Sequence, residues 1–324
     1  MKILLASSIH SEAIEGLRAR HDVLCAFNGS KEVLQEKIAD REVLIFRSGV
    51  QIDADVMESA PDLKLIVRGG SGVDNIDLDY VRRRGLPMVR IPGPGAKAVA
   101  EMSFGLMLVL ARNILPADRL LRQGRWTKHE MTGYLLKGKT LGIIGAGNIG
   151  TRTGKLGVAW GMDVLGCVEH PTPAAADRLQ ENGIRLVDSD ELLARSDFVS
   201  VHVPLKPSTY HLIDDRALAL MKPGAYLINM ARGGVVDEQA LYEALRESRL
   251  RGAALDVHEQ EGDGMISPLA GLPNVVLTPH IGAGTFDSQR EIGAIIMETV
   301  DAFAAGKPAG AHSNGQMQDV VVVA

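Results

Sequence analysis

The chain has 324 residues, with 35 basic and 40 acidic side chains and a formal net charge of −5. This length predicts about two domains. A hydrophobic fraction of 46% and a charged fraction of 23% are those of a globular protein and exclude bulk disorder. The mildly acidic balance, without a basic block, argues against a nucleic acid or an anionic membrane as a partner.

The cysteines and the first residues of the chain help to predict the cellular compartment of the protein. Cys25 and Cys167 lie far apart in apolar, strand-like runs, which predicts buried reduced thiols and a cytoplasmic protein. The apolar run after Lys2 ends at Ala6, whereas a secretory signal needs about 7–15 apolar residues. The longest strongly apolar stretch, 102–111, is shorter than the roughly 18 residues that span a bilayer. We therefore expect no membrane association.

Short apolar, β-branched runs alternate with amphipathic stretches along most of the chain. In the first part, this alternation predicts strands at 3–6, 43–46 and 64–67 and helices at 11–20, 53–60 and 78–84. Continuous apolar strands separated by helices are typical of parallel sheets that are covered on both faces. The first part of the chain is therefore predicted to be an α/β domain.

A long helical segment follows, Lys97–Gln123, which we expect to be interrupted at Pro116. The alternation then restarts, with strands predicted at 140–144, 163–168, 198–202, 225–230, 252–256 and 275–278. A last helix over 287–305 would return the chain to the first domain, against which the tail Gly306–Ala324 would pack. The pattern predicts two doubly wound α/β domains. Their expected bounds are 1–96 with 291–324 for one and 97–290 for the other.

A glycine-rich loop, Gly145-Ala-Gly147-Asn148-Ile149-Gly150, ends a predicted strand and begins a predicted helix. In this context a G-x-G-x-x-G pattern indicates a dinucleotide site. Gly145 would make the tight turn, Gly147 would let the backbone approach a pyrophosphate, and Gly150 would let helix and strand pack closely. The free N–H groups of Asn148, Ile149 and Gly150 would point at the anion from the helix N-terminus.

An acidic residue is expected after the next strand, where it would hydrogen-bond a ribose hydroxyl of the cofactor. Glu169, directly after Val168, is the candidate. A carboxylate there would repel the extra phosphate of NADP, which favours NAD and leaves NADP as the alternative. A solvated loop glutamate is the competing interpretation.

Four further motifs occur in order along the chain. They are Gly69-Gly-Ser71-Gly72-Val-Asp74, Asn229-Met-Ala-Arg232-Gly-Gly-Val-Val-Asp237, Ala254-Leu-Asp256-Val-His-Glu-Gln-Glu261 and Thr278-Pro-His280-Ile-Gly-Ala283. Together with the glycine loop they resemble the D-isomer-specific 2-hydroxyacid dehydrogenases, and most of all the D-3-phosphoglycerate dehydrogenases. The resemblance implies a Rossmann cofactor domain inserted in a flavodoxin-like substrate domain. It also implies a homodimer and a short form without the C-terminal regulatory domain.

The resemblance implies a catalytic set of Arg232, Glu261 and His280, and the chemistry of each side chain fits. The planar guanidinium of Arg232 would grip the carboxylate and carbonyl of a 2-oxo acid through forked hydrogen bonds and orient it for hydride transfer. His280 would protonate the alkoxide that forms. Glu261, hydrogen-bonded to the other ring nitrogen, would favour the imidazolium form.

The resemblance also assigns the other site positions. Asp256 would contact the nicotinamide, and backbone N–H groups of Ser71 and Gly72 would receive the substrate carboxylate. The remaining cofactor contacts lie at strand ends and in the last motif: Val203, Met230, Ala231, Gly282 and Ala283. No residue pattern is assigned to a metal ion.

Two arginines that follow predicted strands of the first domain, Arg47 and Arg68, match phosphate-contacting arginines of the phosphoglycerate enzymes. Paired guanidiniums at neighbouring strand ends suit a phosphate dianion, so 3-phosphoglycerate and 3-phosphohydroxypyruvate are the preferred substrates. Surface ion pairing of one or both arginines is the competing interpretation. Arg90 and Gly95 stand where asparagines are common in the family, and Gly262 stands where a proline is common. These departures bear on the substrate more than on the reaction.

The leading hypothesis is an NAD-dependent dehydrogenase that interconverts a 2-hydroxy acid and its 2-oxo acid. The alternative enzyme is a glyoxylate/hydroxypyruvate-type reductase that acts on unphosphorylated acids and uses NADPH as one option. Removal of Arg47 and Arg68 separates the two, because only a phosphorylated substrate would depend on them. The alternative from another class is a dinucleotide-sensing protein like certain transcriptional corepressors, which a turnover assay distinguishes from an enzyme.

Overall fold

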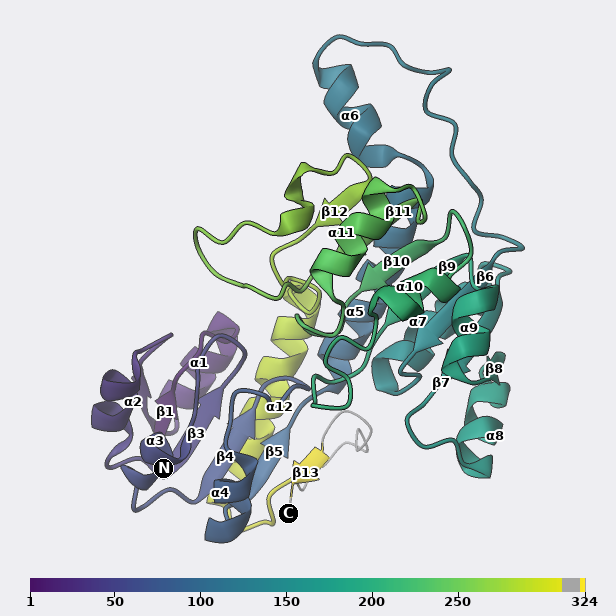
Figure 1. The fold of residues 1–324 in the computed structure, drawn as a ribbon. Coiled ribbons are helices and arrows are strands. Elements are labelled where there is room, and N and C mark those ends of the chain that lie inside the picture. Colours follow the sequence, from purple (N-terminus) through teal and green to yellow (C-terminus); the bar gives the residue numbers. More distant parts are fainter. Residues whose placement is uncertain (311–320, 324) are drawn as a thin grey trace. The chain divides into compact units, whose positions relative to one another are not determined.

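The computed structural model describes residues 1–310 and 321–323. The chain forms two compact units, one of Met1–Ala98 with the described residues from Ala283 onwards, the other of Val99–Gly282 (Figure 1). Each unit has its own sheet of mostly parallel strands with helices on both faces. This arrangement confirms the doubly wound α/β class predicted from the alternation of elements.

The sheet of unit 1 has the strand order β13-β5-β4-β3-β1-β2. Strand β13 is antiparallel to β5, and the other neighbours pair parallel. Without β13, the order is that of the flavodoxin-like fold. The strands are β1 (Lys2–Leu5), β2 (Asp22–Cys25), β3 (Val43–Phe46), β4 (Leu65–Arg68), β5 (Met88–Arg90) and β13 (Val321–Val323).

Helices cover both faces of this sheet, and successive residues of β3 show why its strands are apolar throughout. Val43 and Ile45 pack in the cluster under α1 (Ser11–Arg18) and α12 (Phe286–Ala304). Leu44 and Phe46 pack in the opposite cluster. A strand that is buried on both faces shows a continuous apolar run instead of alternation. The second face is covered by α2 (Lys31–Ile38), α3 (Ala54–Glu58) and α4 (Leu78–Arg84).

The sheet of unit 2 has the order β12-β11-β10-β9-β6-β7-β8, and all its neighbours pair parallel. This is the Rossmann order with one more strand at the β12 edge. The strands are β6 (Thr140–Ile144), β7 (Asp163–Cys167), β8 (Ile184–Leu186), β9 (Phe198–Val201), β10 (Tyr226–Asn229), β11 (Gly252–Leu255) and β12 (Val275–Leu277). The helices after β6 are α7 (Asn148–Ala159), α8 (Pro173–Glu181), α9 (Ser189–Arg195), α10 (Asp215–Leu220), α11 (Glu238–Arg246) and the short 3-10 helix η1 (Pro268–Gly271).

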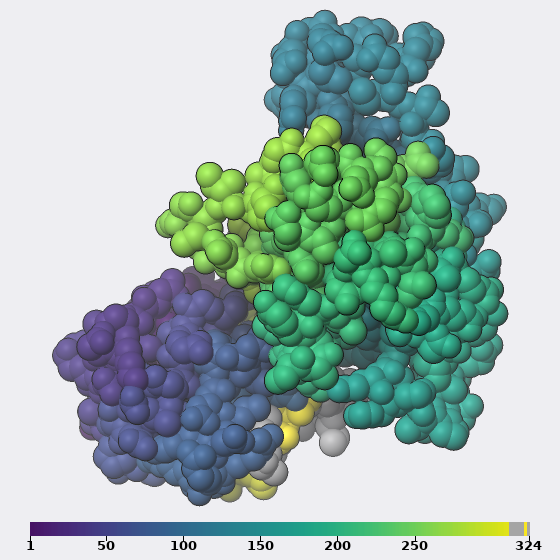
Figure 2. Space-filling view, in the orientation of Figure 1, coloured from purple at the N-terminus to yellow at the C-terminus, as the bar shows by residue number. Residues whose placement is uncertain are grey.

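The expected break of the long helix at Pro116 is wrong. The segment forms α5 (Gly93–Ala111) and α6 (Ile114–Arg122), and the break lies at Asn113, whose φ of 52° is left-handed. Pro116 is accommodated because it lies in the first turn of α6, where its missing N–H has no helical partner to lose. Helix α6 has no buried residue, and it stands out from the rest of unit 2 (Figures 1 and 2).

Helix α5 is longer than the apolar stretch counted from the sequence. Among the described helices it is the one whose length and composition would allow it to cross a membrane. The apolar stretch of this helix is 67% buried inside the protein, as in the core helix of a globular domain.

The compact units change at 98/99 and 282/283, whereas the sequence places the domain bounds at 96/97 and 290/291. The second difference arises because α12 contributes to unit 1 from its first turns, with Ile292 and Ile296 in the core beside β1 and β3. The short strands β2, β5 and β8 are absent from the sequence-based assignment. Of the tail that was expected to pack on the first domain, β13 does join its sheet. Residues 311–320 and 324 lie outside the described part of the chain.

Candidate active site

The predicted catalytic residues follow three adjacent strands of unit 2. Arg232 follows β10, Glu261 follows β11 and His280 follows β12. Because these strands are parallel neighbours, their carboxyl ends meet at one edge of the sheet, where ligands bind in open α/β folds.

The structure joins Glu261 and His280 directly. The Nδ1 atom of His280 lies 2.9 Å from Oε2 of Glu261. The other carboxylate oxygen of Glu261 accepts a hydrogen bond from the backbone N–H of His258, at 3.2 Å. The ring of His258 is itself anchored to the carbonyl of Thr278, at 3.0 Å. His258 therefore supports Glu261, a role that the sequence analysis does not assign to it.

The environment of Glu261 keeps its carboxylate ionised. Burial by itself would raise the pKa of this carboxyl. The hydrogen bond and charge of His280, together with the N–H of His258, outweigh burial and hold the pKa of Glu261 below its ordinary value. A charged carboxylate that engages Nδ1 leaves Nε2 as the ring atom of His280 available for proton exchange with a substrate.

The turn that carries Arg232 packs against the loop that leads to Glu261. Nδ2 of Asn229 donates to the carbonyl of Arg232 at 3.3 Å, and Oδ1 of Asn229 accepts from the N–H of Ala231 at 3.1 Å. A Cβ atom on Gly233 would collide with the carbonyl oxygen of His258. The close approach that glycine permits there holds the Arg232 turn against the loop that leads to Glu261.

Asp256 has a structural task besides its predicted contact with the nicotinamide. It is 2% exposed, and its carboxylate accepts hydrogen bonds from Oγ1 of Thr278 at 2.6 Å and from the N–H groups of Ile281 and Gly282 at 2.9 and 2.8 Å. These bonds hold the turn that carries His280, whose φ of 53° is left-handed. The nicotinamide contact stays a prediction.

Glu261 and His280 line a hollow of about 530 Å³, and Arg232 is not among its lining residues. Its walls come from the loop between β11 and η1 and from the residues after β12, among them His258, Met265, Thr278 and Pro279. The predicted acid–base pair is therefore accessible from at least this side.

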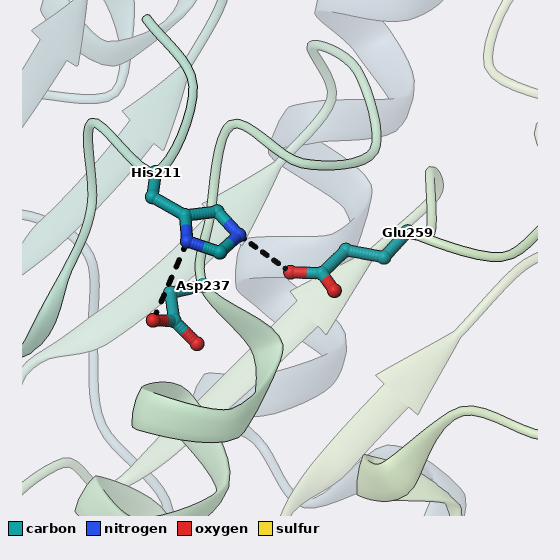
Figure 3. A group of neighbouring side chains, drawn as sticks. All are labelled: His211, Asp237 and Glu259. Atoms are coloured by element: carbon teal, nitrogen blue, oxygen red, sulfur yellow. Dashed lines mark hydrogen bonds and ion pairs between the residues drawn. The ribbon is translucent and has the colours of Figure 1, made fainter.

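Another cluster beside these loops, His211, Asp237 and Glu259, is absent from the sequence analysis (Figure 3). The ring nitrogens of His211 face different acids: Nε2 is 3.0 Å from Oε1 of Glu259, and Nδ1 is 3.5 Å from Oδ2 of Asp237. The donor atoms lie within 4.8 Å of one another, as in a metal site. A metal would take only one ring nitrogen, so this geometry is that of an imidazole bridging two carboxylates. It ties the Glu261 loop to α11, which Asp237 caps.

The glycine loop lies where the sequence predicts it, between β6 and α7. Gly145 has a φ of 87°, and a Cβ on Gly150 would collide with the carbonyl oxygen of Gly145. In contrast, a Cβ on Gly147 would meet nothing within 4 Å. The loop therefore packs tightly on the side of Gly150. On the side of Gly147 there is open space at the start of α7, where Asn148 and Ile149 begin the helix.

A cavity of about 630 Å³ adjoins this loop. Its walls include Gly145, Val168, Glu169, Val203 and Leu212. The open backbone at the α7 N-terminus and the largely apolar cavity fit the pyrophosphate and adenosine of a dinucleotide. Of the other predicted cofactor residues, Met230, Ala231 and Gly282 are buried, and Ala283 is half-buried.

Glu169 lines the cavity with a partner that the sequence did not indicate. Its Oε2 atom lies 2.9 Å from Nζ of Lys206, and this hydrogen bond lowers the pKa of Glu169. The ammonium group offsets part of the negative charge that would repel a 2′-phosphate. The contact of Glu169 with a ribose stays a prediction.

The predicted substrate residues lie at strand ends of unit 1. Arg47 is half-buried after β3, and its backbone is held by Oγ of Ser7 at 3.0 Å. Arg68, the last residue of β4, is buried, with its guanidinium carbon 5.4 Å from the ring centroid of Phe46. Ser71 is exposed and Gly72 half-buried in the turn that follows Arg68. Their contacts with substrate stay predictions.

Comparison with known families agrees with this geometry. Residues 104–282, just over half of the chain, match the model of the D-isomer specific 2-hydroxyacid dehydrogenase, NAD binding domain. The chain belongs to the D-isomer-specific 2-hydroxyacid dehydrogenases. The resemblance that the ordered motifs indicate is thereby confirmed.

Relatives of this dehydrogenase-family chain act on different acids. It is similar to D-3-phosphoglycerate dehydrogenase of Methanocaldococcus jannaschii, with 43% identity over 308 residues that cover 95% of this chain and 58% of the relative. It is 41% identical to hydroxypyruvate reductase of Thermotoga maritima over 272 residues, which cover 83% of this chain and 87% of the relative. The chain thus spans less than two thirds of the phosphoglycerate dehydrogenase.

A solved structure supports the two-unit architecture of this family member. The D-lactate dehydrogenase of Aquifex aeolicus, complexed with NAD and lactic acid, matches with a TM-score of 0.82 and 32% identity. The match covers 94% of this chain and 96% of that one. The match therefore extends across both described units.

Proposed function

We propose that this protein is an NAD-dependent dehydrogenase that interconverts a D-2-hydroxy acid and its 2-oxo acid. The observation that carries the proposal is the Glu261–His280 hydrogen bond of 2.9 Å, at the sheet edge where Arg232 also lies. An imidazole held by a carboxylate at one ring nitrogen is a general acid–base. A guanidinium on the neighbouring strand end is the matching group for an oxo acid.

The residues divide the work as follows. NAD, held at the glycine loop and the adjoining cavity, supplies a hydride acceptor or donor when bound. Arg232 binds the carboxylate and carbonyl of the oxo acid and fixes the direction of approach. His280 gives a proton from Nε2 to the carbonyl oxygen during reduction and takes it back during oxidation, while Glu261 holds the ring through Nδ1.

For the substrate we favour the 3-phosphoglycerate/3-phosphohydroxypyruvate pair, with Arg47, Arg68, Ser71 and Gly72 as its binding residues. Support comes from the 43% identity to a phosphoglycerate dehydrogenase and from the buried guanidinium of Arg68 at the end of β4. The second candidate is reduction of glyoxylate or hydroxypyruvate, which the 41% identity to a hydroxypyruvate reductase favours.

The finer partner and compartment assignments are also proposals. The free thiols Cys25 and Cys167, half-buried where full burial was predicted, support a cytoplasmic location. Exposed apolar side chains on α6 and the loop after it support a homodimer. They include Leu121, Trp126 and Leu135. We expect neither a nucleic acid nor a membrane as a partner.

The deciding experiment is NADH oxidation with 3-phosphohydroxypyruvate and hydroxypyruvate, side by side, with NADPH as a parallel arm. We expect turnover with NADH and a preference of order 100-fold in kcat/KM for the phosphorylated acid, equivalent to about 2.7 kcal/mol. Equal rates would favour the reductase. Binding of NADH without turnover on a broad panel of 2-oxo acids would favour a dinucleotide sensor and overturn the enzyme proposal.

The Glu261→Gln variant tests the acid–base assignment in the same assay. It should lower kcat by roughly 10–100-fold, because an amide leaves the ring in place but removes the charge beside it. Glu243→Gln, which changes a half-buried glutamate of α11 that pairs with Arg246, is the matched control and should leave kcat unchanged.

A further inference from the structure

Arg90 is a third arginine at the carboxyl edge of the unit 1 sheet. Although it is 22 residues from Arg68 in the sequence, it is a direct neighbour of Arg68 in the sheet. It ends β5, the strand next to β4, and the register pairs Arg68 with Arg90 directly. Register partners on parallel neighbours point to the same face of a sheet. The two side chains therefore emerge from the sheet side by side.

Arg47 emerges on the opposite face. It directly follows Phe46, which pairs in register with Arg68, so its side chain has the other orientation. Its Cγ atom lies 3.2 Å from the place that a Cβ of Gly69 would occupy, next to Ile292 of α12. In the fold, the arginine paired with Arg68 is thus Arg90, although the sequence pairs Arg68 with Arg47.

Both side chains of the pair meet one turn, the Gly69–Gly72 turn after β4. A Cβ on Gly70 would lie 2.6 Å from Nη1 of Arg68, so this guanidinium lies against the Gly70 backbone. Nη1 of Arg90 donates to the carbonyl of Ser71 at 3.0 Å. This turn is the one predicted to receive the substrate carboxylate through its N–H groups.

Arg90 has a charge that no acid of the described residues neutralises. The side chain is half-buried, and burial alone lowers the pKa of its guanidinium, with no charged neighbour among the causes. Its Nε is buried and lacks a hydrogen-bond partner in the described structure. A desolvated cation with unused donors favours an anionic ligand, because the ligand restores the interactions lost with water.

We propose that Arg68 and Arg90 together bind a second anionic group of the substrate, a phosphate ester or a carboxylate on the carbon beyond the 2-oxo group. Arg90 is the residue that sets this specificity. Two adjacent planar forks offer parallel donors to the oxygens of one dianion, which a single guanidinium does not. The inference rests on the proposed function, since it concerns the substrate of the same site.

The test compares Arg90→Gln and Arg90→Lys with the wild type in turnover of 3-phosphohydroxypyruvate, oxaloacetate and hydroxypyruvate. Oxaloacetate carries a second carboxylate, so it separates the two anion sources. For Arg90→Gln we expect the ratio of kcat/KM between the preferred acid with a second anionic group and hydroxypyruvate to fall about 30-fold, mainly through KM. Arg90→Lys keeps a charge but not the fork and should lie in between.

The matched control is Arg83→Gln, which changes an exposed arginine of α4 that stacks on Tyr80. In this variant, the ratio of kcat/KM between the preferred acid and hydroxypyruvate should equal that of the wild type. An equal loss on all three substrates for Arg90→Gln would make Arg90 a brace of the Ser71 carbonyl and overturn the inference. An unchanged ratio would overturn it as well.

Calorimetric titration with 3-phosphoglycerate, D-malate and D-glycerate keeps this inference separate from the reaction. The wild type should bind 3-phosphoglycerate or D-malate at least 10-fold more tightly than D-glycerate, and Arg90→Gln should abolish that difference. Absence of turnover on every acid, with this binding difference intact, would overturn the proposed function alone. Equal binding of all three acids by the wild type would overturn the Arg90 inference alone.

Discussion

At the residue scale, the predicted cofactor acid Asp256 holds the catalytic turn as well. Its carboxylate accepts three hydrogen bonds, two of them from backbone N–H groups beside His280. A motif can show that an acid stands at a strand end, but not how many donors converge on it. The motif around Asp256 therefore indicates a cofactor contact but does not show that this residue shapes the turn.

Replacement of Asp256 by Asn should therefore damage stability and activity together. An amide has one acceptor oxygen, so its NH2 group would oppose a backbone N–H in a buried position. We expect a loss of about 1–3 kcal/mol in the free energy of unfolding and a kcat reduced at least 10-fold. Urea denaturation and NADH oxidation measure the two effects. A variant with wild-type stability would show that the turn holds without these bonds.

His202 is the second residue whose environment only the structure reveals. It follows β9, with Nε2 2.9 Å from Oγ of Ser200 and Nδ1 buried without a hydrogen-bond partner among the described residues. Burial lowers the pKa of His202 to about 3. The folded protein therefore keeps this ring neutral, whereas the unfolded chain protonates it near pH 6.5.

This difference predicts a pH dependence of stability. Between about pH 6.5 and pH 3 the unfolded state binds a proton that the native state does not, so stability falls as the pH falls, by up to roughly 1.4 kcal/mol per pH unit. Above pH 6.5 the ring of His202 is neutral in both the folded and the unfolded state, so it does not change the free energy of unfolding with pH. His202→Asn should flatten the acid slope in denaturation curves at pH 5 and 7, whereas His170→Asn, in an exposed loop, should not. Equal slopes in both variants would refute the assignment.

At the scale of elements, the glycine loop shows how one motif contains residues with different physical demands. The pattern of Gly145, Gly147 and Gly150 predicts a strand–turn–helix, and β6 and α7 form there. The pattern alone does not show which glycine serves packing and which serves a ligand. Contacts separate them, since only Gly147 has open space at the Cβ position.

Two alanine variants test this division. Gly150→Ala should destabilise the protein by about 1–3 kcal/mol, because its methyl group would collide with the Gly145 carbonyl. Gly147→Ala should keep the wild-type melting temperature but bind NADH at least 10-fold more weakly, because the methyl group would occupy the space above the helix N-terminus. Fluorescence titration and thermal melting give both readouts. Unchanged NADH affinity in Gly147→Ala would place the pyrophosphate elsewhere.

At the scale of the whole molecule, α6 and the loop after it leave apolar side chains without cover in a single chain. Trp126 and Leu135 are 78% and 71% exposed, and α6 buries none of its residues. Scattered apolar residues are ordinary on a surface, but a projecting segment rich in them indicates an interface. These exposed apolar side chains support the proposed homodimer.

Charge introduced on this segment should separate the subunits. Leu121→Glu combined with Leu135→Glu would place carboxylates in the proposed interface, and we expect a shift from dimer to monomer in sedimentation velocity. Leu205→Glu, at an exposed apolar residue outside the segment, is the control and should leave the mass unchanged. A wild-type chain that sediments as a monomer at micromolar concentration would contradict the proposal.

The sequence by itself determined the class of the fold and the family, because apolar runs on doubly covered strands and ordered motifs are local signals. It also placed Arg232, Glu261 and His280 after strands that prove to be neighbours. Tertiary structure decided which side chains meet. The partnership of Arg68 with Arg90, the anchoring of the His258 ring on the carbonyl of Thr278 and the His211 bridge join residues from different strands and loops. Such contacts depend on strand order and register, which no local pattern contains.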